Sequence, residues 1–211
     1  MSVLKSKRKS SQFEVFHHLY KMRKEVTDLL LRDFGYDLER AEKKVEKIFG
    51  GRRYEELKLE EKVRYDKLKE KYQAFDDWFI ADERQVVVDC LRTITEEVFV
   101  ANSIYPSYME ELVERRIHQD KAIGQCYRLT QELQYAIKTL PVDVNKYTRF
   151  ADMIQTEINL IKGWRKSDNK FKRAISDSAS NFANVNNNGN ANYNNASNSN
   201  GVRPDFDSVI E

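Results

Sequence analysis

The chain has 211 residues, of which 33% are charged, with only seven glycines and three prolines. This composition excludes collagen-like proteins, proline-rich scaffolds and turn-rich β-sandwiches. No apolar run approaches the length of about 18 residues that a membrane-spanning helix needs. The N-terminal segment MSVLKSKRKSS lacks the apolar region of a secretory signal. Two cysteines, Cys90 and Cys126, fit a reducing compartment, so we expect a cytoplasmic protein.

Positive charge is concentrated in two parts of the chain. The formal net charge is +2, but residues 174–211 hold one basic and four acidic residues, a net −3, so residues 1–173 carry +5. Residues 112–173 hold 13 Lys and Arg against 7 Asp and Glu, a net +6. Residues 1–9 form a basic N-terminal arm with Lys5, Lys7, Arg8 and Lys9. Such local charge attracts polyanions. The alternative is that these side chains only solvate helix surfaces.

Residues 10–35 are expected to hold the first long helix. Ser10 and Ser11 are good N-cap residues, and Gly35 is suited to end the helix. Apolar residues recur between them at steps of four and three, which makes one stripe along a helix: Val15, Leu19, Met22, Val26 and Leu29.

Residues 36–74 differ in composition from the rest of this region. They contain 22 charged residues among 39, of which 12 are basic and 10 acidic. Helical spacing continues through Leu38, Ala41, Val45 and Ile48, Gly50-Gly51 then interrupts it, and residues 54–72 favour another helix. The mixed charge indicates a helical hairpin inserted into the fold rather than a nucleic-acid-binding patch.

Three further helices are expected at about 76–103, 107–139 and 144–166. Pro106 and Pro141 separate them, because proline lacks the amide donor that a helix interior needs. Their apolar stripes are, in chain order: Phe79, Val87, Cys90, Ile94, Val98 and Ala101; Met109, Val113, Ile123, Cys126, Leu133, Ile137 and Leu140; Tyr147, Ala151, Ile154, Ile158 and Ile161. No segment has the period of two that a strand requires. The pattern therefore predicts an all-α protein, an antiparallel four-helix bundle over residues 10–173.

Catalytic and metal-binding patterns are sparse. Glu14 and His17 have a spacing that could place two metal ligands on one helix face, but a di-iron bundle needs a second such pair, and Arg115 occupies the matching position before His118. Glycine-rich phosphate loops, Cys-x-x-Cys motifs and nucleophile elbows are missing. We therefore expect a protein that is not an enzyme and uses no metal or cofactor. A helical ribonuclease and a metal-oxidising bundle remain as alternatives.

One segment, Lys162–Arg173, combines six basic residues and one acid with two aromatic residues, Trp164 and Phe171. Basic side chains can neutralise phosphates while an aromatic ring offers a face to an unstacked base. The alternative is an amphipathic helix end, with Trp164 packed on the bundle and the cations beside the helix C-terminus.

A second basic cluster, of Arg115, Arg116 and Lys121, lies near the start of the helix expected at about 107–139. Arg116 and Asp120 fall on its otherwise apolar stripe, so we expect them to pair with each other, the other possibility being an end of the bundle open to a partner. The residues expected to bind nucleic acid or a protein partner are Lys5, Lys7, Arg8, Lys9, Arg115, Arg116, Lys121, Lys162, Trp164, Arg165, Lys166, Lys170, Lys172 and Arg173.

The C-terminal tail, residues 174–211, has an unusual composition. Positions 181–200 hold 11 asparagines in 20 residues, and we expect the tail, residues 174–211, to be disordered. One interpretation of the tail is a low-complexity linker without a specific function. Asparagine codons consist of two adenines followed by a pyrimidine. Substituting either adenine can reach many amino acids but never a stop codon, because no stop codon ends in a pyrimidine. An asparagine-dense stretch is therefore what an adenine-rich template looks like when translated, if its adenines are the sites of mutagenesis.

The tail resembles the translated template repeat of a diversity-generating retroelement, and its ending Asn200-Gly-Val-Arg-Pro-Asp-Phe206 resembles the end of a C-type-lectin variable region. The body resembles the accessory variability determinant (Avd) family of small four-helix bundles. The stretches that carry this resemblance are SVLKSKR near the start, LLLRDFG (29–35), ANSIYP (101–106), ERRIHQDKAIGQC (114–126), LPVDVNKY (140–147) and KGWRKSDNK (162–170).

The resemblance implies a role in mutagenic homing. Proteins of the Avd type associate with the retroelement's reverse transcriptase and with template RNA or cDNA, and some form a homo-oligomer, a pentameric barrel. The insertion at residues 36–74 departs from the short members of the family. The tail is also readable as a template overlapping the gene, without a role as protein. A bundle of the ribosomal-RNA intervening-sequence type, or another RNA-binding helical adaptor, is the alternative.

Overall fold

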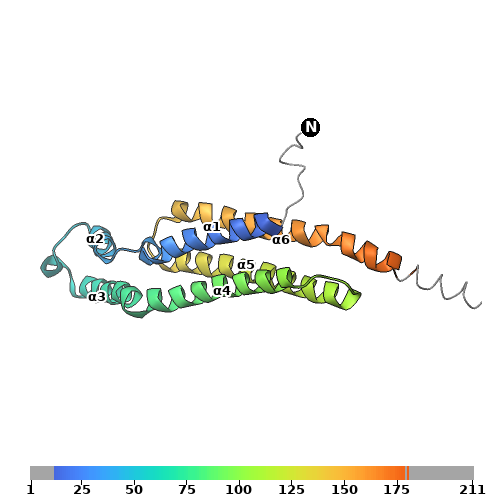
Figure 1. Cartoon of the computed structure of the whole chain (residues 1–211). Coiled ribbons are helices and arrows are strands. Elements are labelled where there is room, and N and C mark those ends of the chain that lie inside the picture. The colour runs from blue at the N-terminus through green and yellow to red at the C-terminus, as the bar shows by residue number, and fades with distance from the viewer. Residues whose placement is uncertain (1–11, 179, 181–211) are drawn as a thin grey trace, which may run out of the picture.

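The computed structural model describes residues 12–178 and 180, and all regular structure in this part of the chain is helical (Figure 1). This confirms the predicted all-α class. The α-helices are α1 (Gln12–Leu30), α2 (Leu38–Ile48), α3 (Leu59–Ala74), α4 (Ile80–Ser103), α5 (Met109–Thr139) and α6 (Thr148–Ser167). The basic arm at residues 1–9 lies outside the described residues, as does most of the tail.

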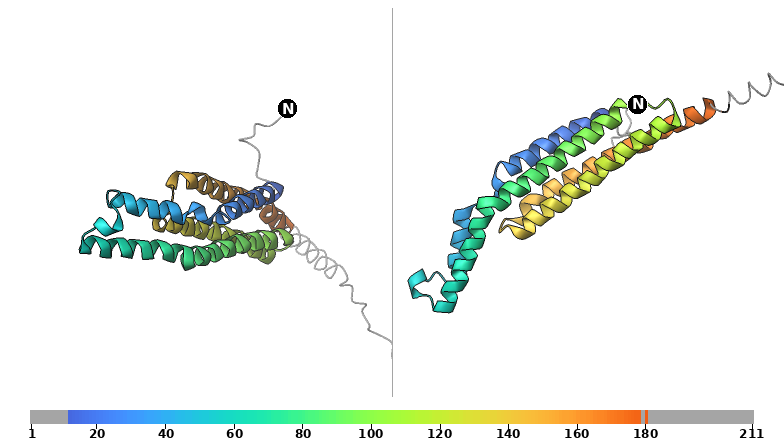
Figure 2. Two further views of the ribbon diagram at one scale, coloured as in Figure 1. Left: turned by 90° about the vertical axis from the view of Figure 1, so that its left-hand side faces the viewer. Right: turned by 90° about the horizontal axis from the view of Figure 1, so that it is seen from below.

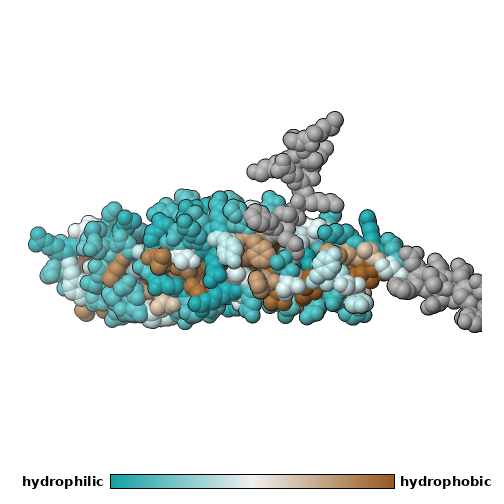
Figure 3. Space-filling view, in the orientation of Figure 1, coloured by the Kyte–Doolittle hydropathy of each residue, from teal (hydrophilic) through white to brown (hydrophobic). Residues whose placement is uncertain are grey.

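The core lies among α1, α4, α5 and α6, which run alongside one another (Figures 1 and 2). Helix α4 packs against α5, α5 against α6, α6 against α1, and α1 against α4. The stripe predicted for α1 is buried throughout, from Val15 to Leu29, and so is the stripe predicted for α4. Cys90 and Cys126 are buried free thiols, as expected, and burial raises the pKa of both. In the view of Figure 3 the surface is mainly hydrophilic, and apolar side chains show in separate patches.

Part of the expected core is wrong by one helical position. In α5, Val113 is exposed, and the buried face instead runs through Leu112, Arg115 and Gln119. Ala151 in α6 and Ile48 in α2 are also exposed. All three positions satisfy apolar spacing. In the first turns of α5 the buried face instead includes Arg115, whose partner Asp168 follows the end of α6, and apolar periodicity cannot reveal such a pairing.

The segment at residues 36–74 contains α2 and α3, joined by a turn in which Gly50 and Gly51 adopt positive φ angles of 70° and 67°. The two helices pack on each other around a small core of Val45, Phe49 and Leu57. The expected break before α4 is replaced by a π-helical segment, Phe75–Phe79, so α3 continues directly into α4. No glycine or proline interrupts this run, and Phe75 and Phe79 are both buried.

The expected disordered tail from residue 174 is wrong at its beginning. Residues 169–178 are helical and extend the direction of α6 beyond Asp168 (Figure 1). Serine hydroxyls bond back along this helix, from Ser176 to the carbonyl of Lys172 and from Ser178 to that of Ala174. The asparagine-rich positions 181–200 lie outside the described residues.

A buried acid on α4 predicts a pH-dependent stability. Glu83 is 4% exposed, and its Oε1 atom has no hydrogen-bond partner in the described part of the chain. Burial, with Glu132 and Asp82 nearby, raises the pKa of Glu83 to about 7. The folded protein therefore keeps a proton that the unfolded chain releases, so stability falls as the pH rises from the ordinary pKa of a glutamate through about 7.

The substitution Glu83→Gln removes this titration. We expect the variant to lose the decline in stability between about pH 5 and 7 and to gain about 1–3 kcal/mol at pH 8. Urea denaturation followed by circular dichroism at both ends of this range measures the effect. Glu96→Gln, at an exposed position of the same helix, is the matched control and should keep the slope of the unmodified protein. A Glu83→Gln variant with an unchanged slope contradicts the assignment.

Candidate functional site

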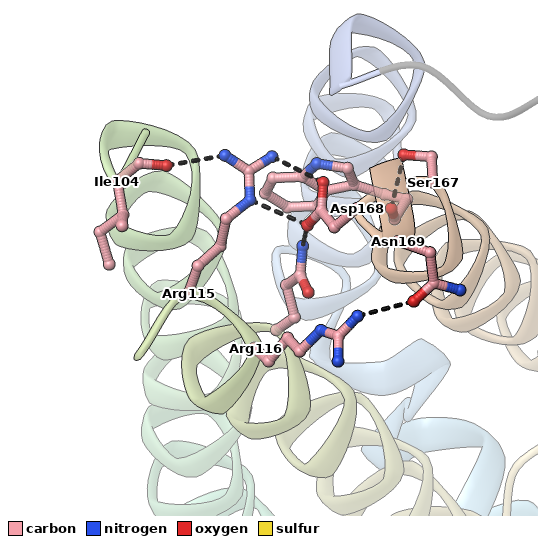
Figure 4. Close-up of polar contacts among 8 residues, drawn as sticks. Ile104, Arg115, Arg116, Ser167, Asp168 and Asn169 are labelled. Carbon is pink, nitrogen blue, oxygen red and sulfur yellow. Dashed lines mark hydrogen bonds and ion pairs between the residues drawn. The ribbon is translucent and has the colours of Figure 1, made fainter. Parts of the chain in front are cut away.

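A buried ion pair joins α5 to the end of α6. Arg115 is 3% exposed and Asp168 is 1% exposed. The guanidinium of Arg115 donates to both carboxylate oxygens of Asp168, at 2.9 and 3.2 Å, and to the carbonyl of Ile104 at 2.7 Å (Figure 4). Gln119 donates to Asp168 at 2.8 Å. Arg115 is thus a structural cation, and the expectation that it contacts nucleic acid is wrong because its guanidinium is almost fully buried and held by Asp168 and Ile104.

Trp164 belongs to the same buried cluster. Its side chain is 1% exposed, and the Arg115 guanidinium lies over the indole ring at 5.0 Å from the centroid. The expectation that Trp164 stacks on a base is wrong, since the ring has no free face. The packed helix end, the alternative interpretation of this segment, is what the structure contains.

The next residue along α5, Arg116, points toward α6 at the surface. Its guanidinium donates to the side-chain oxygen of Asn169 at 2.8 Å (Figure 4). Asp120 pairs with Arg165 of α6 at 2.9 Å. The expected pairing of Arg116 with Asp120 is therefore wrong: each finds a partner on the neighbouring helix. These two contacts join the solvent-exposed edge of α5 to that of α6 and the residue that follows its C-terminal cap.

An open surface pocket of about 290 Å³ lies between these two helix edges. We call it the cationic pocket; its lining residues are Arg116, Lys162, Arg165, Lys166 and Asn169. The lining holds four cations and no carboxylate, and one of the cations, Arg165, is neutralised by Asp120 just outside it. Within the described part of the chain, Arg116, Lys162 and Lys166 have no carboxylate within 4.0 Å. The pocket is therefore a concentrated, incompletely neutralised positive site.

The other expected binding residues in the described part of the chain do not line this pocket. Lys121 lies on the α4 side of α5, with Nζ at 4.0 Å from a carboxylate oxygen of Glu97. Lys170, Lys172 and Arg173 are exposed on the helical extension at residues 169–178. The remaining candidates, Lys5, Lys7, Arg8 and Lys9, fall outside the described residues. The structure thus brings together four of the cations expected from sequence, and the other candidates among the described residues lie outside this pocket.

Two residues beside these cations were missed by sequence reasoning. Asn169 accepts from Arg116 and lines the pocket. Tyr127 of α5 lies next to Lys162, whose Nζ donates to the phenolic oxygen at 3.0 Å. Asn169 sits inside the basic segment and could have been included, whereas Tyr127 is 35 residues away from Lys162 and carries no local signal.

Two histidines, His18 and His118, contact carboxylates elsewhere in the protein. His18 lies 2.7 Å from the fully buried carboxylate of Glu157, and burial raises the pKa of Glu157 while His18 opposes that shift. His118 contacts Glu97. Among the described residues, no group of three or more His, Cys, Asp or Glu side chains is arranged to hold a metal ion. None of the described helices combines the length and apolar character needed to cross a membrane.

Comparisons of the chain with protein-family models, with curated proteins and with solved structures gave no match.

Proposed function

We propose that this protein is an accessory protein of a diversity-generating retroelement, of the Avd type, which binds template RNA or its cDNA and the reverse transcriptase during mutagenic cDNA synthesis. The observation that carries the nucleic-acid part is the cationic pocket, where four basic side chains gather without a carboxylate in the lining. Side chains of this kind neutralise phosphates and release counterions. The sequence resemblance and the asparagine-rich tail support the choice of retroelement.

The proposal includes a structural part. We take α1, α4, α5 and α6 as an antiparallel four-helix bundle, with α2 and α3 as the insertion. The closed set of contacts among the four long helices supports this interpretation. By resemblance the protein acts as a homo-oligomer, a pentamer in the short family members, in the cytoplasm. It acts by binding rather than by catalysis and uses no cofactor.

The salt dependence of RNA binding tests the proposal. If three or four cations meet phosphates of a single strand, the logarithm of the association constant falls with a slope of about −2 to −3 against the logarithm of salt concentration. Affinity then decreases about 15- to 65-fold between 50 and 200 mM salt. Fluorescence anisotropy with a labelled template RNA measures it. Absence of binding at 50 mM salt, or a slope near zero, contradicts the proposal.

The partner is tested separately. We expect a reverse-transcriptase gene beside the gene for this protein. We also expect an adenine-rich repeat that overlaps codons 176–206. Co-purification of the reverse transcriptase with this protein is the matching biochemical result. RNA binding without either of these would favour a ribosomal-RNA intervening-sequence type of bundle or another helical RNA adaptor.

A further inference from the structure

An exposed aromatic ring lies beside the cationic pocket. Tyr127 of α5 is 46% exposed. Lys162 of α6, which lines the pocket, contacts the Tyr127 side chain. Its Nζ lies 3.0 Å from the phenolic oxygen and 5.6 Å from the ring centroid. The contact fixes the ring at the edge of the pocket without burying it. Of the two aromatic residues in the basic segment, Trp164 is buried and Phe171 packs against Tyr105 and Arg115 away from the pocket lining, so we take Tyr127 as the ring for this site.

The pocket and the ring follow one line along the molecule. Arg116 and Tyr127 are 11 positions apart in α5, which corresponds to about 16 Å at the rise of an α-helix. Along this line the cations come from α6: Lys166 and Arg165 near Arg116, then Lys162 near Tyr127. A flexible strand lying there would meet a series of basic side chains, one of which, Arg165, is paired with Asp120, followed by an aromatic face.

This arrangement discriminates between forms of nucleic acid. In a duplex the bases are stacked and paired inside, so an isolated tyrosine at the surface meets only backbone. In an unpaired strand a base can turn out and stack on the ring while the phosphates on either side stay with the cations. An acidic peptide would use the cations but would gain little from the ring.

We propose that the cationic pocket and Tyr127 together form a binding site for an unpaired nucleic-acid strand, with the cations on its phosphates and Tyr127 stacked on one base. This inference rests on the proposed function and specifies the form of its ligand. The chemistry is shared by single-stranded RNA and single-stranded cDNA. Stacking tolerates either sugar and any base, which suits a template that is copied with errors.

Tyrosine substitutions with a backbone-only ligand test the inference. Anisotropy is measured with a single-stranded RNA, the same sequence as DNA, an abasic strand of equal length, and the duplex. We expect Tyr127→Leu to weaken binding of the base-bearing strands about fivefold to a hundredfold and to leave the abasic strand unchanged. Tyr127→Phe keeps the ring and should bind within about threefold of the unmodified protein. The duplex should bind more weakly than either single strand.

The matched control is Tyr135→Leu, which changes a tyrosine of similar exposure, 53%, on the same helix. It should bind all ligands like the unmodified protein, and circular dichroism should show equal helicity in all variants. The inference is overturned if Tyr127→Leu binds the single strands normally, if it weakens the abasic strand equally, or if the duplex binds as tightly as the strand. In those cases RNA binding by the unmodified protein would still support the proposed function, which falls only if no nucleic acid binds.

Discussion

Replacing Arg115 by alanine is expected to lower the free energy of unfolding by about 3–5 kcal/mol. The substitution leaves the carboxylate of Asp168, 1% exposed, without its cation, and Gln119 alone cannot compensate a buried charge. It also removes the guanidinium from the face of Trp164. Urea denaturation followed by circular dichroism at neutral pH measures the change.

Two variants separate the lost ion pair from general effects. Arg116→Ala, at the adjacent but surface-directed position, should cost less than about 1 kcal/mol, because its partner Asn169 is exposed and uncharged. The double variant Arg115→Met with Asp168→Leu removes both charges and should lie within about 2 kcal/mol of the unmodified protein. If Arg115→Ala unfolds at the same urea concentration as Arg116→Ala, the buried ion pair does not have the structural role assigned to it.

Reversing two charges in the cationic pocket is expected to weaken RNA binding about tenfold to a hundredfold at moderate salt. The variant is Lys162→Glu with Lys166→Glu, since neither lysine has a carboxylate partner in the described part of the chain. Arg165 is left in place because it holds Asp120. Loss of two phosphate contacts should also reduce the salt slope by about 1.4, and the variant should keep its helicity.

The matched control carries the same change in net charge on the α2–α3 hairpin. Lys47→Glu with Lys67→Glu alters two exposed lysines at the opposite end of the molecule from the end of α6 (Figure 1). It should bind RNA almost normally. An equal loss of affinity in both variants would mean that binding depends only on total charge, and no loss in the pocket variant would mean that the strand binds elsewhere.

Much of the fold follows from the sequence because apolar periodicity determines which face of a helix is buried. The stripe from Val15 to Leu29 and the prolines at 106 and 141 were enough to place α1 and the ends of α4 and α5. The continuity of α3 with α4 could not be predicted in this way, since the π-helical segment at Phe75–Phe79 shifts the register without any residue that breaks a helix.

The candidate site was only half predictable. The basic segment after Lys162 was visible as composition, but which of its members face solvent depends on the rotation of α6 about its axis. Burial of a cation is disfavoured unless it is paired, so Arg115 was expected at the surface; its partner, Asp168, is 53 residues away. The exposure of Tyr127 likewise depends on the packing of α5 against α6, which no local pattern records.

Photo-crosslinking of a 4-thiouridine-substituted template RNA to the full-length protein, followed by mass spectrometry of the crosslinked peptides, locates the bound strand on the protein. We expect crosslinks on the facing edges of α5 and α6, around Tyr127 and between Lys162 and Asn169, and their loss in the Lys162→Glu, Lys166→Glu variant. Crosslinks confined to the α2–α3 hairpin, or an unchanged pattern in that variant, would contradict the proposed site.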